Sequence, residues 1–85
     1  MFLRVFGVNA RIGEVRRASR GGAVFLLLRL TEQPPRDILA ATDVTAERLS
    51  DVVPVEQDLS RRNLRAAELD LRFRDQVVAR LQREP

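Results

Sequence analysis

The sequence of 85 residues contains no cysteine, histidine, tryptophan or tyrosine, and it also lacks lysine, so all 15 of its basic residues are arginine. Protein ligands for zinc, haem and iron–sulfur clusters are mainly His and Cys, and we therefore expect neither a metal site nor a cofactor. A Ser–His or Cys–His nucleophile would lack its base, and a Schiff-base enzyme would lack its amine. These absences predict a protein that is not an enzyme.

Long hydrophobic runs are absent too. The apolar run over residues 23–28 ends at Arg29 and is too short to cross a bilayer, and no signal peptide is visible at the N-terminus. Hydrophobic residues make up 45% and charged residues 32%, the balance of a globular domain. We expect a single cytoplasmic domain over residues 1–85. Because so small a domain buries little surface and has no metal or disulfide to add, we also expect a homo-oligomer.

Charge is segregated into three blocks along the chain. Residues 1–31 carry six arginines and one glutamate, residues 32–60 carry two arginines and seven acidic residues, and residues 61–85 carry seven arginines and four acidic residues. Such blocks can steer a charged partner, or they can pair with one another within a fold or a dimer. The acidic residues lack the regular register and the turn glycine of a calcium loop, so no metal site is expected from them.

The N-terminal half reads mostly as extended chain. Residues 2–8 are rich in aromatic and β-branched residues and predict a strand. Residues 9–19 fit either a strand bent at Gly13 or a short helix capped by Asn9, and we favour the strand. Residues 19–22 predict a hairpin turn that uses glycine for positive φ, and the apolar residues 23–31 predict a central strand.

The C-terminal half is predicted to alternate between helix and strand. Pro35 indicates the start of a helix over residues 36–42, and Asp43 or Thr45 is suited to cap a second turn over residues 46–49. Residues 52–55 predict an edge strand at best, because Pro54 cannot donate to a ladder.

Residues 68–74 alternate between charged and apolar side chains, which is the pattern of a half-buried strand. Asp75 is then suited to cap a short helix in which Val77, Val78 and Leu81 share a face. One helix over residues 60–84 is the alternative, but its apolar side chains would scatter around the helix axis.

The predicted order is β-β-α-β-β-α. It indicates an α+β two-layer sandwich, in which a four-stranded antiparallel sheet is covered on one face by two helices. Residues 7–12 (GVNARI), the Gly21-Gly22 turn, the hydrophobic strand after it and the Pro34-Pro35 linker together resemble the second half of an ACT domain, over about residues 7–55. The resemblance implies a permuted or swapped ferredoxin-like fold, a regulatory role and small-ligand binding at a dimer interface, with Asn9 as the one matching ligand contact.

Four arginines surround the predicted hairpin and form its candidate binding surface: Arg11, Arg16, Arg17 and Arg20. We predict that they face the acidic block of a neighbouring copy in a non-catalytic, self-associating regulatory or interaction module. The alternative is nucleic-acid binding, since arginine forms bidentate contacts with phosphates. No aromatic side chain lies beside these arginines to stack on a base, and the sequence therefore favours protein association.

Overall fold

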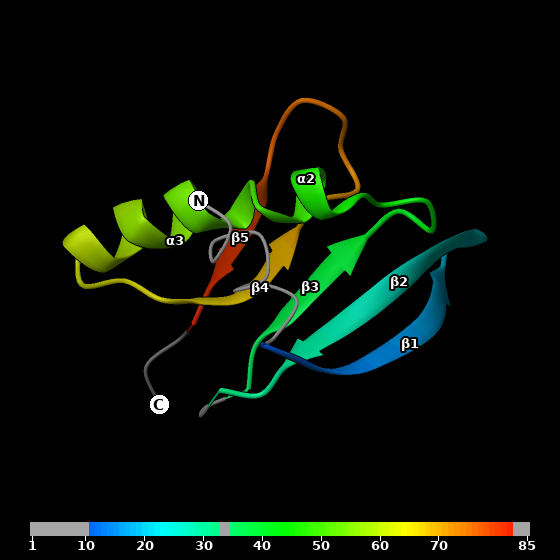
Figure 1. The fold of residues 1–85 in the computed structure, drawn as a ribbon, viewed down its shortest axis with the longest axis horizontal. Helices are drawn as coiled ribbons and strands as arrows, with labels where there is room; N and C mark the ends of the chain where they lie inside the picture. The colour runs from blue at the N-terminus through cyan, green and yellow to red at the C-terminus, as the bar shows by residue number, and fades with distance from the viewer. Residues whose placement is uncertain (1–10, 33–34, 83–85) are drawn as a thin grey trace.

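The chain forms a five-stranded mixed sheet with helices on one of its faces (Figure 1). The structure is a computed structural model that describes residues 11–32 and 35–82. Its sheet order follows the chain, and its elements are β1 (Ile12–Arg20), β2 (Ala23–Leu30), β3 (Asp37–Ala40), α2 (Ala46–Leu49), α3 (Val52–Arg61), β4 (Ala66–Asp70) and β5 (Val78–Leu81). The strand predicted over residues 2–8 and the contact predicted for Asn9 lie outside the described residues.

The predicted β1–β2 hairpin is confirmed, but the central position predicted for residues 23–31 is wrong, because β2 is second in the order of five strands and β3 is the central one. Gly21 and Gly22 form the turn with φ of 60° and 84°, a backbone conformation that glycine adopts without strain. A bulge between Ile12 and Glu14 bends β1 at Gly13. A Cβ atom at Gly13 would lie 2.6 Å from the Thr31 Cγ2 atom, so this close approach of the two strands requires glycine.

Residues 37–40 form strand β3, and the helix predicted over residues 36–42 is wrong. β3 pairs antiparallel with β2 and parallel with β4, so it is the central strand of the sheet. Ile38, Leu39 and Ala40 are all fully buried. A short apolar run is compatible with a strand covered on both faces and with the buried side of a helix. Here residues 37–40 are a strand because they pair with β2 on one edge and with β4 on the other.

The edge strand predicted over residues 52–55 is also wrong, because these residues begin helix α3. Pro54 occupies the third position of α3, within the first turn, where a helix does not need the N–H that proline lacks. Thr45 caps α2 as predicted: its hydroxyl accepts a hydrogen bond from the backbone N–H of Arg48 at 3.1 Å. Helices α2 and α3 form the crossover that the parallel β3–β4 pair requires.

The C-terminal segment forms two strands where we expected one strand and one helix. β4 ends at Asp70, earlier than the predicted strand over residues 68–74, and residues 78–81 form β5 instead of a helix capped by Asp75. β5 pairs antiparallel with β4, with Leu69 opposite Ala79 and Asp70 opposite Val78. Sheet pairing therefore overrides the helical spacing of Val77, Val78 and Leu81.

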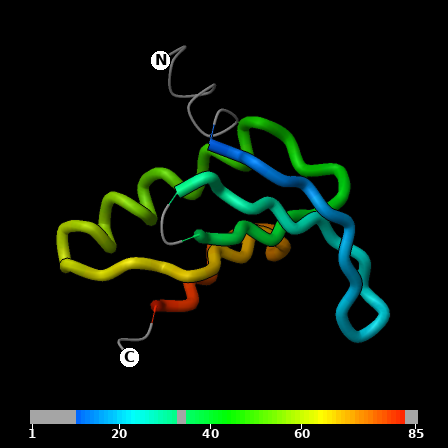
Figure 2. Tube along the Cα trace, turned by 90° about the horizontal axis from the view of Figure 1, so that it is seen from below, coloured from blue at the N-terminus to red at the C-terminus, as the bar shows by residue number. Residues whose placement is uncertain are grey.

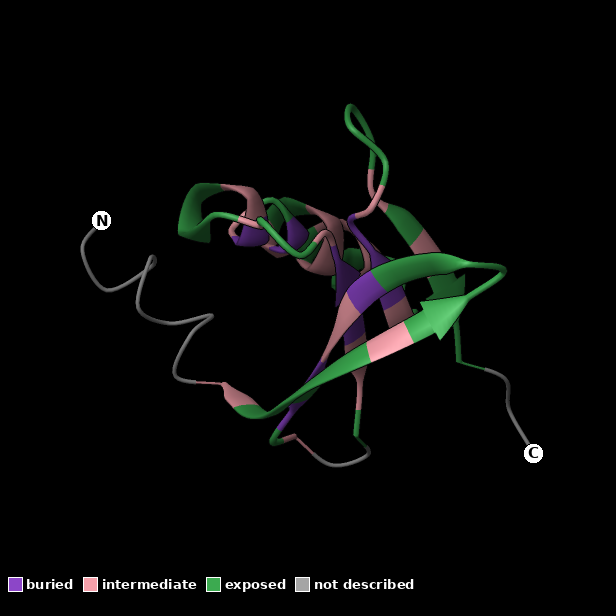
Figure 3. Cartoon of the chain, turned by 90° about the vertical axis from the view of Figure 1, so that its right-hand side faces the viewer, coloured by how far each residue is buried: buried purple, intermediate pink, exposed green. Residues whose placement is uncertain are grey.

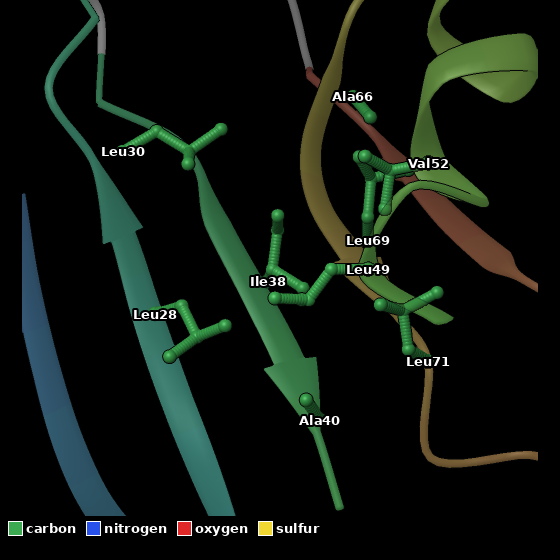
Figure 4. Packing of buried hydrophobic residues seen from close by; sticks show 9 residues of the cluster. All are labelled: Leu28, Leu30, Ile38, Ala40, Leu49, Val52, Ala66, Leu69 and Leu71. Carbon is green, nitrogen blue, oxygen red and sulfur yellow. The ribbon is translucent and has the colours of Figure 1, made fainter. Parts of the chain in front are cut away.

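The core lies between the helices and one face of the sheet (Figures 2 and 4). Cross-strand neighbours Leu28, Ile38 and Leu69 pack there with Leu49 of α2 and Val52 of α3. In Figure 3 the buried, purple segments lie on the strands and the helices that face each other, whereas most of the β1–β2 hairpin is exposed. The fold is α+β with the helices on one face, as predicted. The antiparallel four-stranded sheet with two full helices is corrected to a mixed five-stranded sheet, with one full helix and the single turn α2.

Candidate functional site

The sheet has two outer strands, β1 and β5, and neither has a second strand neighbour within the described residues. Backbone N–H and C=O groups on such an edge can pair with a strand of another chain. The side chains and geometry of the two edges therefore decide which edge is protected from pairing and which one is open to it.

The β1 edge has the features that protect a strand from pairing. It carries Glu14, Arg16, Arg17 and Arg20, and it is bent by the bulge at Gly13. Arg16 donates to Glu14 through Nη2 at 2.8 Å and through Nε at 3.1 Å, which keeps this pair on the strand surface. Charged side chains and bulges on an edge both disfavour the addition of another strand.

The β5 edge presents apolar side chains to solvent. Val78 and Leu81 are 45% and 44% exposed. Arg80 donates to Glu68 of β4 at 3.2 Å, and this is the one ion pair of β5 within the described residues. β5 has only four residues, and β4 is its one strand neighbour. Exposed apolar side chains beside unpaired backbone groups favour association at this edge.

The loop between β4 and β5 lies beside α2 in Figure 1, and Arg48 of α2 holds it. Arg48 Nη2 donates to the carbonyl oxygens of Leu71 at 3.3 Å and Gln76 at 2.9 Å, and also to that of Phe73. Arg48 Nη1 donates to Asp51 Oδ2 at 2.7 Å. One side chain of the helix layer thus fixes the loop that leads into the open edge.

Two hollows of about 390 and 380 Å³ flank Phe73 at the end of the parallel β3–β4 pair. They share Ala41, Arg72 and Phe73, and Phe73 is 45% exposed. Ligands of sheets with parallel strands often bind where those strands end. The second hollow is completed by three apolar residues of β2: Ala23, Val24 and Phe25.

Asp70 and Arg72 form an ion pair next to these hollows, on the face of the sheet that no helix covers. Arg72 donates to Asp70 through Nε at 2.9 Å, through Nη2 at 2.7 Å and through its backbone N at 3.0 Å. Burial alone would raise the pKa of Asp70, but the hydrogen bonds from Arg72 outweigh it and lower that pKa below its usual range. The guanidinium of Arg72 also lies 4.7 Å from the ring centre of Phe25, which is 2% exposed.

The structure places three of the four predicted arginines on the β1–β2 hairpin and the fourth, Arg11, in a separate ion cluster. Arg11 lies in an ion cluster, where it donates to Glu32 and Glu56. Arg16 pairs with Glu14, and Arg17 is exposed on β1. Arg20 lies 5.7 Å from the ring centre of Phe25. Arg16, Arg17 and Arg20 thus share the hairpin, whereas Arg11 does not join them.

Much of the acidic block is ion-paired within the chain. Glu32 and Glu56 contact Arg11 and Arg36, and the remaining ion-paired carboxylates are Asp37 with Arg29, Asp51 with Arg48, and Asp58 with Arg61 and Arg62. The alternating charge blocks therefore serve folding, at least in part. This agrees with the interpretation that the blocks pair within one molecule.

Sequence reasoning missed Arg48 and the exposure of Phe73. Arg48 lies in a helical turn rich in charged residues, and no sequence pattern marks it as a contact of the loop. Its acceptors are carbonyls of a loop more than twenty residues away. Phe73 continues the alternation of Leu69 and Leu71, which placed it in the core. The strand ends at Asp70, and Phe73 lies in the loop beyond it.

Within residues 11–32 and 35–82, no three acidic side chains gather as a metal site, and no helix is long and apolar enough to cross a membrane. Comparisons of the chain with family models, with curated proteins and with solved structures gave no match in any of the three.

Proposed function

We propose that this chain is a non-catalytic protein-interaction module that accepts a strand from a partner at the β5 edge. The observation that carries the proposal is the contrast between the two edges. β1 is bent by a bulge and carries four charged side chains around its exposed Val15, whereas β5 presents Val78 and Leu81 with one charged residue, Arg80, after a loop anchored by Arg48. Backbone pairing gives affinity in such complexes, and the alternate side chains of the added strand give specificity.

The partner is an extended segment of another protein in which apolar residues alternate with acidic ones. Arg80 is exposed on β5, Arg74 is exposed in the loop that precedes it, and Arg72 borders both hollows. Positive charge around an apolar edge selects partners of opposite charge and speeds their encounter.

A second copy of this chain fits the β5 edge less well. It would bring the same arginines to the same edge, and like charges disfavour pairing across adjacent strands. Self-association through the charge blocks, which the sequence predicts, would also draw on acidic residues that already have partners within the chain. We therefore favour a different protein as the partner.

The test uses a fluorescent peptide in which valine alternates with glutamate, with fluorescence anisotropy as the measurement. We expect saturable binding to the full chain and no binding of a control peptide in which proline replaces the central valine, since proline lacks the N–H that a ladder needs. Equal anisotropy changes with both peptides would mean that charge alone drives binding, and no change with either would contradict the proposal.

The edge that binds is identified by two matched substitutions. Val78→Glu on β5 should weaken peptide binding at least tenfold, because it adds repulsion and removes an apolar contact. Val15→Glu on β1 is the control, since Val15 is 60% exposed on the opposite outer strand. Equal losses in both variants would reject β5 as the accepting edge. Sedimentation of the unlabelled chain completes the test: a dimer abolished by Val78→Glu would show that a second copy occupies the edge.

A further inference from the structure

Arg48 connects the helix layer to the loop between β4 and β5. It lies on α2, in the helix layer, and its guanidinium reaches three carbonyl oxygens of the β4–β5 loop and one carboxylate of Asp51. Its side chain is 23% exposed, so these hydrogen bonds are partly shielded from water. A planar guanidinium with five N–H donors can serve several acceptors at once, and a lysine ammonium cannot match that geometry.

The three carbonyls belong to residues 71, 73 and 76, which lie between the strands and take no part in the β4–β5 register. Leu71 donates its N–H to the carbonyl of Leu39, so the first loop residue is tied to β3. After that residue, Asp70 accepts from the backbone N–H of Arg72, and Arg48 donates to the carbonyls of Phe73 and Gln76 farther along the loop. The loop enters β5 directly, at Val78.

We propose that Arg48 is a positioning residue that holds the β4–β5 loop and thereby keeps the β5 edge in the conformation that accepts a strand. The relevance of this role to binding rests on the proposed function. β5 is paired on one side only, and a short outer strand frays unless its ends are held. An edge that is already ordered loses less conformational entropy when a partner binds.

The effect on binding follows from the fraction of molecules whose edge is ordered. When the competent state is only partly populated, the apparent dissociation constant rises by the inverse of that fraction. Loss of the Arg48 contacts should therefore slow association and leave dissociation nearly unchanged, because the bound edge is the same. A role limited to general stability would leave both rates unchanged under conditions where the variant is folded.

Hydrogen exchange of the full chain without any peptide tests the positioning role alone. In Arg48→Met we expect faster amide exchange over residues 72–81 and unchanged exchange in β2 and β3. Arg48→Lys keeps the charge and some donors, and should give an intermediate result. Arg61→Met is the matched control, since Arg61 makes one exposed pair with Asp58 at 3.2 Å. Unchanged exchange over residues 72–81 in Arg48→Met, or an equal increase throughout the sheet, would overturn the proposal.

Binding of the alternating valine–glutamate peptide supplies the second measurement. We expect an association rate about tenfold lower for Arg48→Met, partial recovery in Arg48→Lys and no change in Arg61→Met. If the wild-type chain binds the peptide and Arg48→Met binds it at the same rate, the positioning role is wrong and the proposed function stands. If the wild-type chain does not bind while exchange changes as expected, the proposed function fails and the hold of Arg48 on the loop stands.

Discussion

Asp70 is the most buried acidic side chain among the described residues, and its charge depends on Arg72. The pKa of Asp70 is lower in the folded chain than in the unfolded chain, where it is about 3.9. The pair therefore stabilises the fold at pH values above the unfolded pKa. This stabilisation is lost as the pH falls through the lower, folded value.

We predict that Asp70→Asn removes the part of the pH dependence of stability that the Asp70–Arg72 pair causes. At neutral pH the substitution should lower the free energy of unfolding by about 1–3 kcal/mol, since a charged hydrogen-bond acceptor is lost. Below about pH 4 the difference from wild type should shrink. Urea unfolding at several pH values measures both effects. Asp58→Asn is the control because its side chain is 44% exposed, and a difference that persists undiminished in acid would contradict the prediction.

Gly13 allows a close approach that any side chain would obstruct. We predict that Gly13→Ala lowers the free energy of unfolding by about 1–3 kcal/mol, because the new Cβ would lie 2.6 Å from Thr31 Cγ2 and the bulge would have to move. Thr31→Ser removes that Cγ2 atom. The cost of Gly13→Ala should therefore fall in the Thr31→Ser background, as measured by a double-mutant cycle in urea. Additive costs would show that the contact is not the cause.

At the scale of elements, local signals predicted the hairpin and the cap, and pairing between distant segments decided the rest. The turn glycines act through their own φ, and the hydroxyl of Thr45 caps the backbone three residues later. Gly13 marks a bulge within its own strand, and all of these features were predictable. Residues 37–40 and 78–81 are short, and their strand state depends on neighbours that a sequence pattern does not identify. In the candidate site, the open edge follows from that pairing, and this explains why sequence reasoning missed it.

The β1–β2 hairpin carries the alternative prediction of nucleic-acid binding. If that alternative holds, replacement of Arg16 and Arg17 by alanine should abolish a gel shift at low salt, and the affinity of the wild type for duplex DNA should fall with salt at a slope of about −0.9 per phosphate contact. The control replaces Arg61 and Arg62, which pair with Asp58 on α3. No shift with the wild-type chain, or equal loss in the control, would reject the hairpin as a nucleic-acid site.

At the scale of the whole molecule, one ion cluster joins four parts of the fold. Glu32 after β2 and Glu56 of α3 hold Arg11, which precedes β1, and Arg36, which precedes β3. Arg36 is the most buried arginine of this group, and burial lowers its pKa from the ordinary value. Carboxylates on both sides keep its charge compensated, so this corner of the fold depends on both glutamates.

We predict that Glu56→Gln lowers the free energy of unfolding by about 1–3 kcal/mol, because it leaves two guanidinium groups with less compensation in a partly buried site. Thermal unfolding followed by circular dichroism measures the loss. Asp58→Asn on the same helix removes exposed ion pairs and should change stability by less than about 1 kcal/mol. Equal effects of the two substitutions would show that burial of the ion cluster adds nothing to the free energy of unfolding.

The parallel β3–β4 pair has a consequence for the order of folding. Strands β1, β2 and β3 follow one another as antiparallel neighbours, so their contacts close short loops and can form early. β4 reaches β3 only after residues 41–65 have closed a longer loop, and β5 can pair only once β4 is present. During synthesis and refolding, the side of β3 that β4 covers thus stays exposed until the crossover has closed. The apolar run of residues 38–40 is then the segment most open to mispairing between chains until the crossover closes.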